Sequence, residues 1–345
     1  MRILCHIHTF NDEEVIDRCV ESVVAQTRPP DQLLIVDNAS ADSTLERNFP
    51  RGTEIIRNAE NVGTSGAVGV GLRYAMVHGY DWVWVLDADA TPRPEALEQL
   101  MALWDRLPTD QQRRVWRMSC LPLEAPEKAI NEQSRAVKLL TYTGSNELKP
   151  RHGIVFHDYG CHQIDPDRDA HLVHDGEYYE FDYSIWSGCL FRTEAVRQVE
   201  LPNADYVLDY GEYEYAYRGK LAGLTGIMSL NSTIVQNITG HATYRFTQYL
   251  LLGLRFQLIE MPAFRCYYLC RNLLNFWVFE FRGQRLRAAA PRVLKTLLLT
   301  LNFMLRPVSR NPELRACVRG LWDGIWRRMD RRYTVYGRKR AGATR

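Results

Sequence analysis

Short runs typical of β-strands alternate with segments of helical periodicity over the first hundred residues of the chain. The strand-like runs are residues 3–10, 33–36, 54–57 and 82–86, and the helical segments between them are residues 13–26, 43–49 and 66–78. In residues 13–26 the apolar side chains recur at the spacing of one helix face. This alternation predicts an α/β fold, in which helices cover both faces of a mostly parallel sheet.

Polar residues gather where three of these strands are expected to end. The three clusters are Thr9-Phe10-Asn11, Asp37-Asn38-Ala39-Ser40 and Asp87-Ala88-Asp89. In open α/β sheets, ligands bind outside the carboxyl ends of the strands. We therefore expect these clusters to border one ligand site.

Asp87 and Asp89 directly follow the apolar run 82–86. Side chains two positions apart at the end of a strand point in the same direction. Two carboxylates placed in this way can hold a hard divalent cation beside a diphosphate. The chain has two other Asp-x-Asp pairs, Asp165/Asp167 and Asp167/Asp169, but these lie in loosely patterned sequence and are expected to be solvated loop charges.

Together with their neighbours, these motifs resemble those of family 2 glycosyltransferases of the GT-A fold, within the group of rhamnosyltransferases and galactofuranosyltransferases. The resembling segments follow the family's order over roughly residues 1–275: Thr9–Asn11, Val36–Thr44, Asn58–Gly63, Leu86–Asp89, Ser187–Phe191, Asp209–Glu214 with Arg218, His241, and Tyr267–Asn272. The resemblance implies a GT-A domain, Rossmann-like, over residues 1–240. Residues 105–183 would be a loosely patterned acceptor-side insertion, and residues 241–345 a helical, Arg-rich region.

The resemblance implies that one group of residues binds the nucleotide-sugar donor. Asp37 would accept a hydrogen bond from the pyrimidine base, and Thr9 and Asn11 would line the same pocket. Asn61 and Gly63 would lie along the nucleoside and the donor sugar, where glycine allows close backbone approach. A turn-capping role is the alternative for Asp37.

A second group is implied to hold the diphosphate and its metal ion. Asp89 would ligate Mg²⁺ or Mn²⁺, and Asp87 would contact the ribose or a metal-bound water. His241 would complete the metal shell, with an ordinary surface or core histidine as the alternative.

Glu212 is the candidate general base, because an acceptor hydroxyl is a poor nucleophile until a carboxylate takes its proton. In the resembling family an acidic residue, usually Asp, holds this position. Asp209 and Glu214 could substitute for it. A carboxylate in the first turn of a helix can also serve only to stabilise the helix dipole.

The C-terminal part of the chain is strongly basic. Residues 246–345 contain 20 Lys+Arg and 5 Asp+Glu, a charge of 20 − 5 = +15, so the rest of the chain carries +2 − 15 = −13. Helices are predicted at residues 250–259, 267–281, 293–305 and 316–329, with arginine, aromatic and leucine side chains interleaved. No apolar run is long enough to span a bilayer. We predict that these helices lie on anionic lipid, with nucleic acid or a simple solvated bundle as alternatives.

These features together predict an inverting, metal-dependent glycosyltransferase that acts in surface polysaccharide or cell-wall biosynthesis. The first candidate donor is dTDP-L-rhamnose, the second is UDP-galactofuranose, and the acceptor would be a lipid-linked glycan or polysaccharide. No nucleic-acid partner is expected. Because no signal peptide opens the chain and its cysteines form no Cys-x-x-Cys pair, we expect a cytoplasmic protein, peripheral on the inner face of the cell membrane.

Two other classes of protein are alternatives to this interpretation. A sugar-nucleotide pyrophosphorylase would carry a glycine-rich, Arg-containing loop after its first strand, where this chain has Asn11-Asp12-Glu13-Glu14. A non-catalytic glycan- or lipid-binding protein would not require Asp87, Asp89 and Glu212 together.

Overall fold

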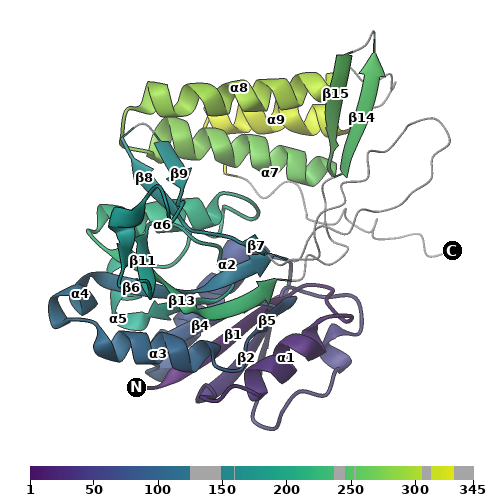
Figure 1. Cartoon of the computed structure of the whole chain (residues 1–345). Coiled ribbons are helices and arrows are strands. Elements are labelled where there is room, and N and C mark those ends of the chain that lie inside the picture. Colours follow the sequence, from purple (N-terminus) through teal and green to yellow (C-terminus); the bar gives the residue numbers. More distant parts are fainter. Residues whose placement is uncertain (125–148, 159, 237–244, 252–253, 305–311, 330–345) are drawn as a thin grey trace, which may run out of the picture. The chain divides into compact units, whose positions relative to one another are not determined.

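The computed structural model describes residues 1–124, 149–158, 160–236, 245–251, 254–304 and 312–329 (Figure 1). Their contacts divide the chain into two compact units. One is formed from residues 1–124 and 148–237, and the other lies within residues 238–345.

The first unit is built on a sheet whose N-terminal half is entirely parallel. Its strands lie in the order β4-β1-β2-β3, and their bounds are β1 (Ile3–Thr9), β2 (Gln32–Asp37), β3 (Glu54–Arg57) and β4 (Trp82–Asp87). Parallel pairing places the ends of β1, β2 and β4 at one edge, since Thr9 pairs with Asp37 and His8 with Asp87. The three polar clusters therefore meet at this edge, as the sequence predicted.

The other half of the sheet contains parallel and antiparallel pairs. Beyond β4 the order continues β12-β6-β13-β11-β10, with β5 on β13 and β7 on β6. The bounds are β5 (Ala90–Pro92), β6 (Val115–Glu124), β7 (Lys149–Pro150), β10 (Val173–His174), β11 (Tyr178–Phe181), β12 (Cys189–Arg192) and β13 (Thr225–Gln236). A separate hairpin joins β8 (Ile154–His157) to β9 (Gly160–Gln163).

Helices cover both faces of the sheet, and the alternation of β1 separates two hydrophobic cores. Ile3, Cys5 and Ile7 belong to a core that includes α1 and α3, whereas Leu4 belongs to one that includes α2 and α5. The helices are α1 (Ile16–Val24), α2 (Gly63–His78), α3 (Ala96–Arg106), α4 (Thr109–Arg114), α5 (Thr193–Val199) and α6 (Gly211–Leu221), with short 3₁₀ turns η1 (Thr44–Glu46) and η2 (Ala170–Leu172). The predicted α/β architecture is confirmed.

Sequence patterns missed some elements of this unit and overextended another. Strand β13 escaped prediction because its register against β6 shifts between Ser229 and Thr233, which interrupts the alternation of side chains. Helix α3 was not predicted either. The helix predicted over residues 43–49 shrinks to the single turn η1, whose start is capped by Asp42 through the Thr44 amide and hydroxyl at 3.1 and 2.6 Å.

The described residues of the second unit form three long helices and a hairpin. They are β14 (Arg245–Leu251), β15 (Leu254–Glu260), α7 (Ala263–Leu274), the π-helical turn η3 (Asn275–Glu280), α8 (Arg285–Met304) and α9 (Pro312–Ile325). The helix predicted over residues 250–259 is wrong, because this stretch forms the hairpin. In this hairpin the backbone of Tyr249 lies opposite Phe256 and that of Phe246 opposite Ile259.

Helices α7 and α9 pack closely through glycines. A β-carbon on Gly320 would lie 2.4 Å from the Tyr267 carbonyl oxygen, and one on Gly324 would lie 2.9 Å from that of Arg271. Arg271 is fully buried, and its Nε donates to Asn272 Oδ1 at 2.8 Å. The Tyr267–Asn272 motif therefore forms part of the core of this unit. Among the described helices, none combines the length and hydropathy that a bilayer crossing requires.

Candidate functional site

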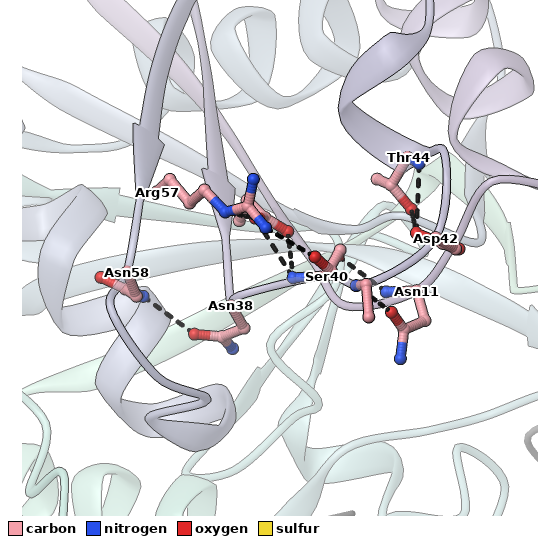
Figure 2. A network of polar contacts seen from close by, with 9 residues as sticks. Asn11, Asn38, Ser40, Asp42, Thr44, Arg57 and Asn58 are labelled. Carbon is pink, nitrogen blue, oxygen red and sulfur yellow. Dashed lines mark hydrogen bonds and ion pairs between the residues drawn. The ribbon is translucent and has the colours of Figure 1, made fainter. Parts of the chain in front are cut away.

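Asn11 joins the loop after β1 to the loop after β2 (Figure 2). It adopts a left-handed conformation with φ of 57°, its backbone N–H donates to Ser40 Oγ at 2.8 Å, and its Oδ1 accepts from the Ala41 N–H at 2.7 Å. Asn is one of the few side chains that tolerates this backbone conformation. These contacts fix the two loops relative to each other.

Asp37, at the end of β2, is fully buried, and its carboxylate already has partners. The Ser40 N–H lies 3.1 and 3.2 Å from its two oxygens, which is the turn-capping contact considered from the sequence. Arg57 Nε lies 3.3 Å from Oδ2, and Arg57 Nη2 donates to the Ser40 carbonyl at 2.7 Å (Figure 2). Arg57 was not predicted as a site residue, because no known sequence motif links it to Asp37.

Thr9 lies at the same strand edge and is also buried. Its hydroxyl donates to Asp12 Oδ2 at 2.9 Å, and the same oxygen accepts from the Phe10 N–H at 2.8 Å. Thr9 therefore helps to fix the Asp12 carboxylate, a residue that the sequence analysis did not assign to the site.

Gly63 begins α2 where only glycine fits. It has φ of 75°, and a β-carbon there would lie 2.0 Å from the Val207 carbonyl oxygen. Asn61 Oδ1 accepts from the Gly63 N–H at 2.8 Å, and Asn38 Nδ2 donates to the Gly63 carbonyl at 3.3 Å. The requirement for glycine at this position thus has a reason within the fold, namely the packing of the loop before α6.

Asp87 is held at three points. Oδ1 lies 2.8 Å from His8 Nε2, Oδ2 accepts from Gln236 Nε2 at 3.0 Å, and the backbone N–H donates to Ser187 Oγ at 3.1 Å. His8 comes from β1 and Gln236 from the end of β13. Neither residue was assigned to the site from the sequence.

Asp89 lies in a concentration of negative charge. Burial, followed by the charges of Asp87 and Asp12, raises the pKa of its carboxyl to about 8. Carboxylate oxygens are the ligands that Mg²⁺ and related hard cations prefer, and a cation would offset the mutual repulsion of these acids. The donor set therefore fits a divalent cation.

The described residues do not form a complete set of metal ligands. Within the described ranges, no three His, Cys, Asp or Glu side chains are grouped so that they could hold a metal ion. His241, the third predicted ligand, lies outside the described residues.

Glu212 stands in the first turn of α6 and is partly buried. Oε1 accepts from the Trp186 N–H at 3.0 Å, and Oε2 accepts from the Tyr183 hydroxyl at 3.1 Å. Burial raises the pKa of Glu212 above its usual 4.5, opposed by the Trp186 N–H; Asp87 raises it further, and Arg151 opposes the rise. Glu212 therefore lies within electrostatic reach of both Asp87 and Arg151.

The turn before Glu212 is conformationally restricted. Asp209 and Tyr210 both have left-handed backbones, with φ of 54° and 63°. A β-carbon on Gly211 would lie 1.9 Å from Ser65 Oγ on α2, so this turn packs directly against α2. Such strain in residues other than glycine costs of order 1–3 kcal/mol each and often marks functional sites.

Glu214, the other alternative base, is tied into the fold. It is buried and pairs with Arg218, whose Nη1 and Nη2 also donate to the Val199 and Leu201 carbonyls at 2.7 and 2.9 Å. This environment suits a structural ion pair. Glu212 is the member of the acidic motif that the structure brings towards Asp87.

Comparison with known proteins shows which proteins the residues of this site resemble. Residues 5–154, which include the clusters after β1, β2 and β4, match the family model described as glycosyl transferase family 2. The galactofuranosyltransferase GlfT1 of Mycolicibacterium smegmatis is 30% identical over 86 residues, covering 24% of this chain and 28% of the relative. The undecaprenyl-phosphate mannosyltransferase of Micrococcus luteus is 30% identical over 106 residues, covering 29% and 43%.

A solved structure shares the fold. GalNAc-T7, crystallised with UDP, GalNAc and Mn²⁺, has a TM-score of 0.53 at 14% identity, covering 73% of this chain and 45% of that one. The present chain spans less than half the length of each of these three proteins. The resemblance found in the sequence is confirmed, and the first unit has the GT-A fold.

Proposed function

We propose that this chain, which carries a glycosyl transferase family 2 domain at residues 5–154, is an inverting glycosyltransferase that moves a sugar from a pyrimidine nucleotide to an acceptor hydroxyl. The observation that carries the proposal is that one loop contacts both Glu212 and Asp87. Trp186 contacts the Glu212 carboxylate, and the next residue, Ser187, contacts the backbone of Asp87. Two adjacent loop residues, Trp186 and Ser187, therefore contact the proposed base and the residue whose carboxylate faces the diphosphate.

Glu212 supplies the proton acceptor for the reaction. Its carboxylate takes the proton of the acceptor hydroxyl as that oxygen forms a bond to the anomeric carbon of the donor. The bond from the anomeric carbon to the diphosphate breaks, and the diphosphate leaves with the bonding pair. Attack from the face opposite the leaving group inverts the anomeric centre. A raised pKa makes Glu212 a better base than an ordinary carboxylate.

Asp89 and Asp87 are the described residues that would hold Mg²⁺ or Mn²⁺, with His241 as the predicted third ligand. When bound, such an ion neutralises negative charge on the leaving diphosphate. The Mn²⁺ bound in the structure of GalNAc-T7 supports this part of the proposal.

Asp37 and Arg57 favour a uracil or thymine base. Their side chains, 3.3 Å apart, place a hydrogen-bond acceptor beside several donors. The imide edge of uracil and thymine offers one N–H between two carbonyl oxygens, which matches this pair, whereas cytosine presents an acceptor in place of that N–H. This pair therefore suits a UDP or dTDP donor, and the sequence resemblance supplies the two proposed donors, dTDP-L-rhamnose and UDP-galactofuranose. The name of the mycobacterial relative adds support to the second.

Attachment to a membrane and a lipid-linked acceptor complete the proposal. Large apolar side chains are exposed at helical spacing on two helices of the second unit: Leu294, Leu297, Leu298 and Leu301 on α8, and Val318, Trp322, Ile325 and Trp326 on α9. We call these the apolar stripes of α8 and α9. With the +15 charge of residues 246–345, they suit the interface of an anionic bilayer at the inner face of the cell membrane.

A thermal-shift series with nucleotides tests the donor side. With Mn²⁺ present, UDP or dTDP should raise the melting temperature, because a ligand at about 100 times its Kd stabilises the folded state by about 2.7 kcal/mol. CDP should raise the melting temperature less than UDP does. In Arg57→Ala, the difference between the shifts caused by UDP and CDP should be smaller. The proposal is wrong if neither UDP nor dTDP stabilises the protein.

A further inference from the structure

We propose that a pocket beside Glu212 binds the sugar ring that carries the acceptor hydroxyl. The inference rests on the proposed glycosyltransferase function and adds the location and nature of the acceptor site. The pocket has a volume of about 250 Å³ and is lined by residues that include Arg151, His152, Gln163, Tyr183 and Tyr213. The sequence placed residues 105–183 on the acceptor side as a region, but it gave none of these side chains an individual role.

A single loop connects the pocket to the reacting groups. Tyr183 lines the pocket and donates to Glu212 Oε2 at 3.1 Å. Three residues further on, the Trp186 N–H contacts Glu212 Oε1 at 3.0 Å, and Ser187 then contacts Asp87 at 3.1 Å. Along this loop, Tyr183 lines the pocket, Trp186 contacts the base Glu212, and Ser187 contacts Asp87 on the diphosphate side. That is the order in which acceptor, proton acceptor and donor must stand for a direct displacement.

The position of the charges agrees with this order. Asp87 raises the pKa of Glu212, and Arg151, which lines the pocket, opposes that rise. Glu212 is therefore influenced both by the carboxylate on the proposed diphosphate side and by the basic residue of the pocket. An acceptor hydroxyl entering from the pocket meets Glu212 before it meets the donor.

The size of the pocket indicates one ring. A volume of 250 Å³ corresponds to roughly eight water molecules at about 30 Å³ each. Sites for drug-sized ligands commonly span about 300–1,000 Å³. The pocket is therefore suited to a single sugar ring and leaves the rest of a glycan or lipid carrier outside.

The lining also suits a polyhydroxylated ring. Tyr183 and Tyr213 stack with ring centroids 4.1 Å apart, and aromatic rings pack against the C–H faces of sugars. Burial lowers the pKa of His152, which keeps its imidazole neutral, and His152 Nδ1 is buried without a hydrogen-bond partner among the described residues. A buried polar atom without a partner is unfavourable, so a ligand hydroxyl that hydrogen-bonds to it would be favoured.

A neighbouring pocket provides a contrast. It has a volume of about 330 Å³, and its lysine forms an ion pair, since Lys220 Nζ lies 2.6 Å from Asp182 Oδ2; His162 Nε2 lies 3.4 Å from Asp169 Oδ2 without a hydrogen bond. Neighbouring side chains on a strand point to opposite faces, so on β9 His162 lines this second pocket and Gln163 lines the first.

This alternation supplies matched variants for a test. Gln163 is exposed, so Gln163→Trp should fill the proposed acceptor pocket without disturbing the core, and His162→Trp should fill the other pocket. The probes are octyl glycosides of rhamnose, galactofuranose, mannose and N-acetylglucosamine, observed by saturation-transfer NMR on the full chain with UDP and Mg²⁺ present. Transfer kinetics would then use any glycoside that accepts sugar.

We expect at least one glycoside to bind the wild-type protein. Gln163→Trp should abolish its signal or raise its KM by about tenfold or more, while His162→Trp and Gln163→Ala stay within about threefold of wild type. UDP affinity should be unchanged in all variants. Full glycoside binding by Gln163→Trp, or no glycoside binding to UDP-loaded wild type, would overturn the acceptor pocket. Failure of UDP itself to bind would instead contradict the proposed transferase function.

Discussion

The two acids of the Asp87-Ala88-Asp89 motif have different surroundings, although they are two positions apart. Both oxygens of Asp87 are held by side chains from other strands, His8 on β1 and Gln236 on β13. A carboxylate held at both oxygens keeps one orientation, which is the geometric requirement for a ligand or for a contact to ribose. Burial and the neighbouring acids raise the pKa of Asp89 to about 8. The two residues should therefore respond differently to removal of a cation.

Removal of the Asp89 carboxylate should separate metal binding from folding. Asp89→Ala should nearly abolish both transfer and Mn²⁺ binding measured by electron paramagnetic resonance, since the site loses a ligand. Its melting temperature without metal should not fall, because the ionised carboxylate is disfavoured in the folded state. Asp167→Ala, in another Asp-x-Asp pair, is the matched control and should bind Mn²⁺ normally. Full wild-type activity in excess EDTA would contradict the assignment.

Glu212 combines two strong hydrogen bonds with a raised pKa. The Trp186 N–H and the Tyr183 hydroxyl both donate to its carboxylate. Glutamine can preserve both contacts, because its Oε1 can accept from Trp186 and its amide can donate to the Tyr183 oxygen. Glu212→Gln is therefore a substitution that removes the proton acceptor and leaves the geometry intact.

Glu212→Gln should lower kcat by about 10²–10⁴-fold and leave donor affinity almost unchanged. Asp209→Asn and Glu214→Gln should be milder in kcat. If Glu212→Gln keeps more than about a tenth of wild-type kcat while either neighbour loses it, the base is misassigned.

The pH dependence follows from the direction of the shift. A raised pKa means that Glu212 keeps its proton to a higher pH in the folded state than in the unfolded chain. The acid limb of kcat should therefore lie above pH 4.5, the ordinary value of the group. Ionised Glu212 also lowers stability, a cost that is absent below that value and grows as pH rises through the folded pKa. Thermal melts should show Glu212→Gln to be the more stable protein near pH ~7, with the difference vanishing near pH ~4.

The site depends on how the starts of two helices pack together. Helix α2 begins at Gly63 against the Val207 carbonyl, and α6 begins at Gly211 against Ser65 of α2. The turn that delivers Glu212 is thus set by its contact with the segment that follows Asn61. Close packing of this kind explains why each of these helices begins with glycine, and contact with a ligand is not needed to explain it.

Gly63→Ala should destabilise the protein strongly. A left-handed conformation costs a residue with a β-carbon about 1–2 kcal/mol, and overpacking adds about 1–3 kcal/mol, so the total is about 2–5 kcal/mol. Gly52 is the matched control, because it has φ of 86° but nothing within 4 Å of an added β-carbon. Gly52→Ala should show only the smaller, conformational cost in urea unfolding. Equal losses in the two variants would contradict the packing role of Gly63.

The two units of the molecule differ in surface chemistry. The chain outside residues 246–345 carries −13, whereas residues 246–345 carry +15 and include the apolar stripes of α8 and α9. On α9 the opposite face is packed, with Cys317, Gly320 and Gly324 buried. An amphipathic helix with a packed face and an exposed apolar face is available for an interfacial contact.

Replacement of the α9 tryptophans should weaken binding to anionic vesicles. Trp322 and Trp326 are 50% and 59% exposed, so Trp322→Glu with Trp326→Glu should preserve the fold while removing apolar contact and adding charge repulsion. Val77→Glu, on α2 of the first unit and 74% exposed in wild type, is the matched control. Sedimentation with phosphatidylglycerol vesicles should fall only for the double variant and should weaken with salt. Equal sedimentation of both variants and wild type would contradict the interfacial contact.

The sequence by itself determined the alternation of strands and helices in the first hundred residues and the polar ends of three strands, because side-chain periodicity is a local property of the chain. It also identified Asp87, Asp89, Asp37 and Glu212 as candidates through motif order. It failed over residues 250–259, where cross-strand pairs outweighed a pattern that also fits a helix, and at β13, where a bulge hides the alternation.

Only the tertiary structure decided which side chains meet. Gln236 contacts Asp87 from 149 positions away, and no local spacing predicts such a partner. Arg57 on Asp37, the loop from Tyr183 to Ser187 and the acceptor pocket likewise arise from the order in which strands pair across the sheet. Strand order depends on how distant apolar faces are buried together, and this is a property of the packed chain as a whole.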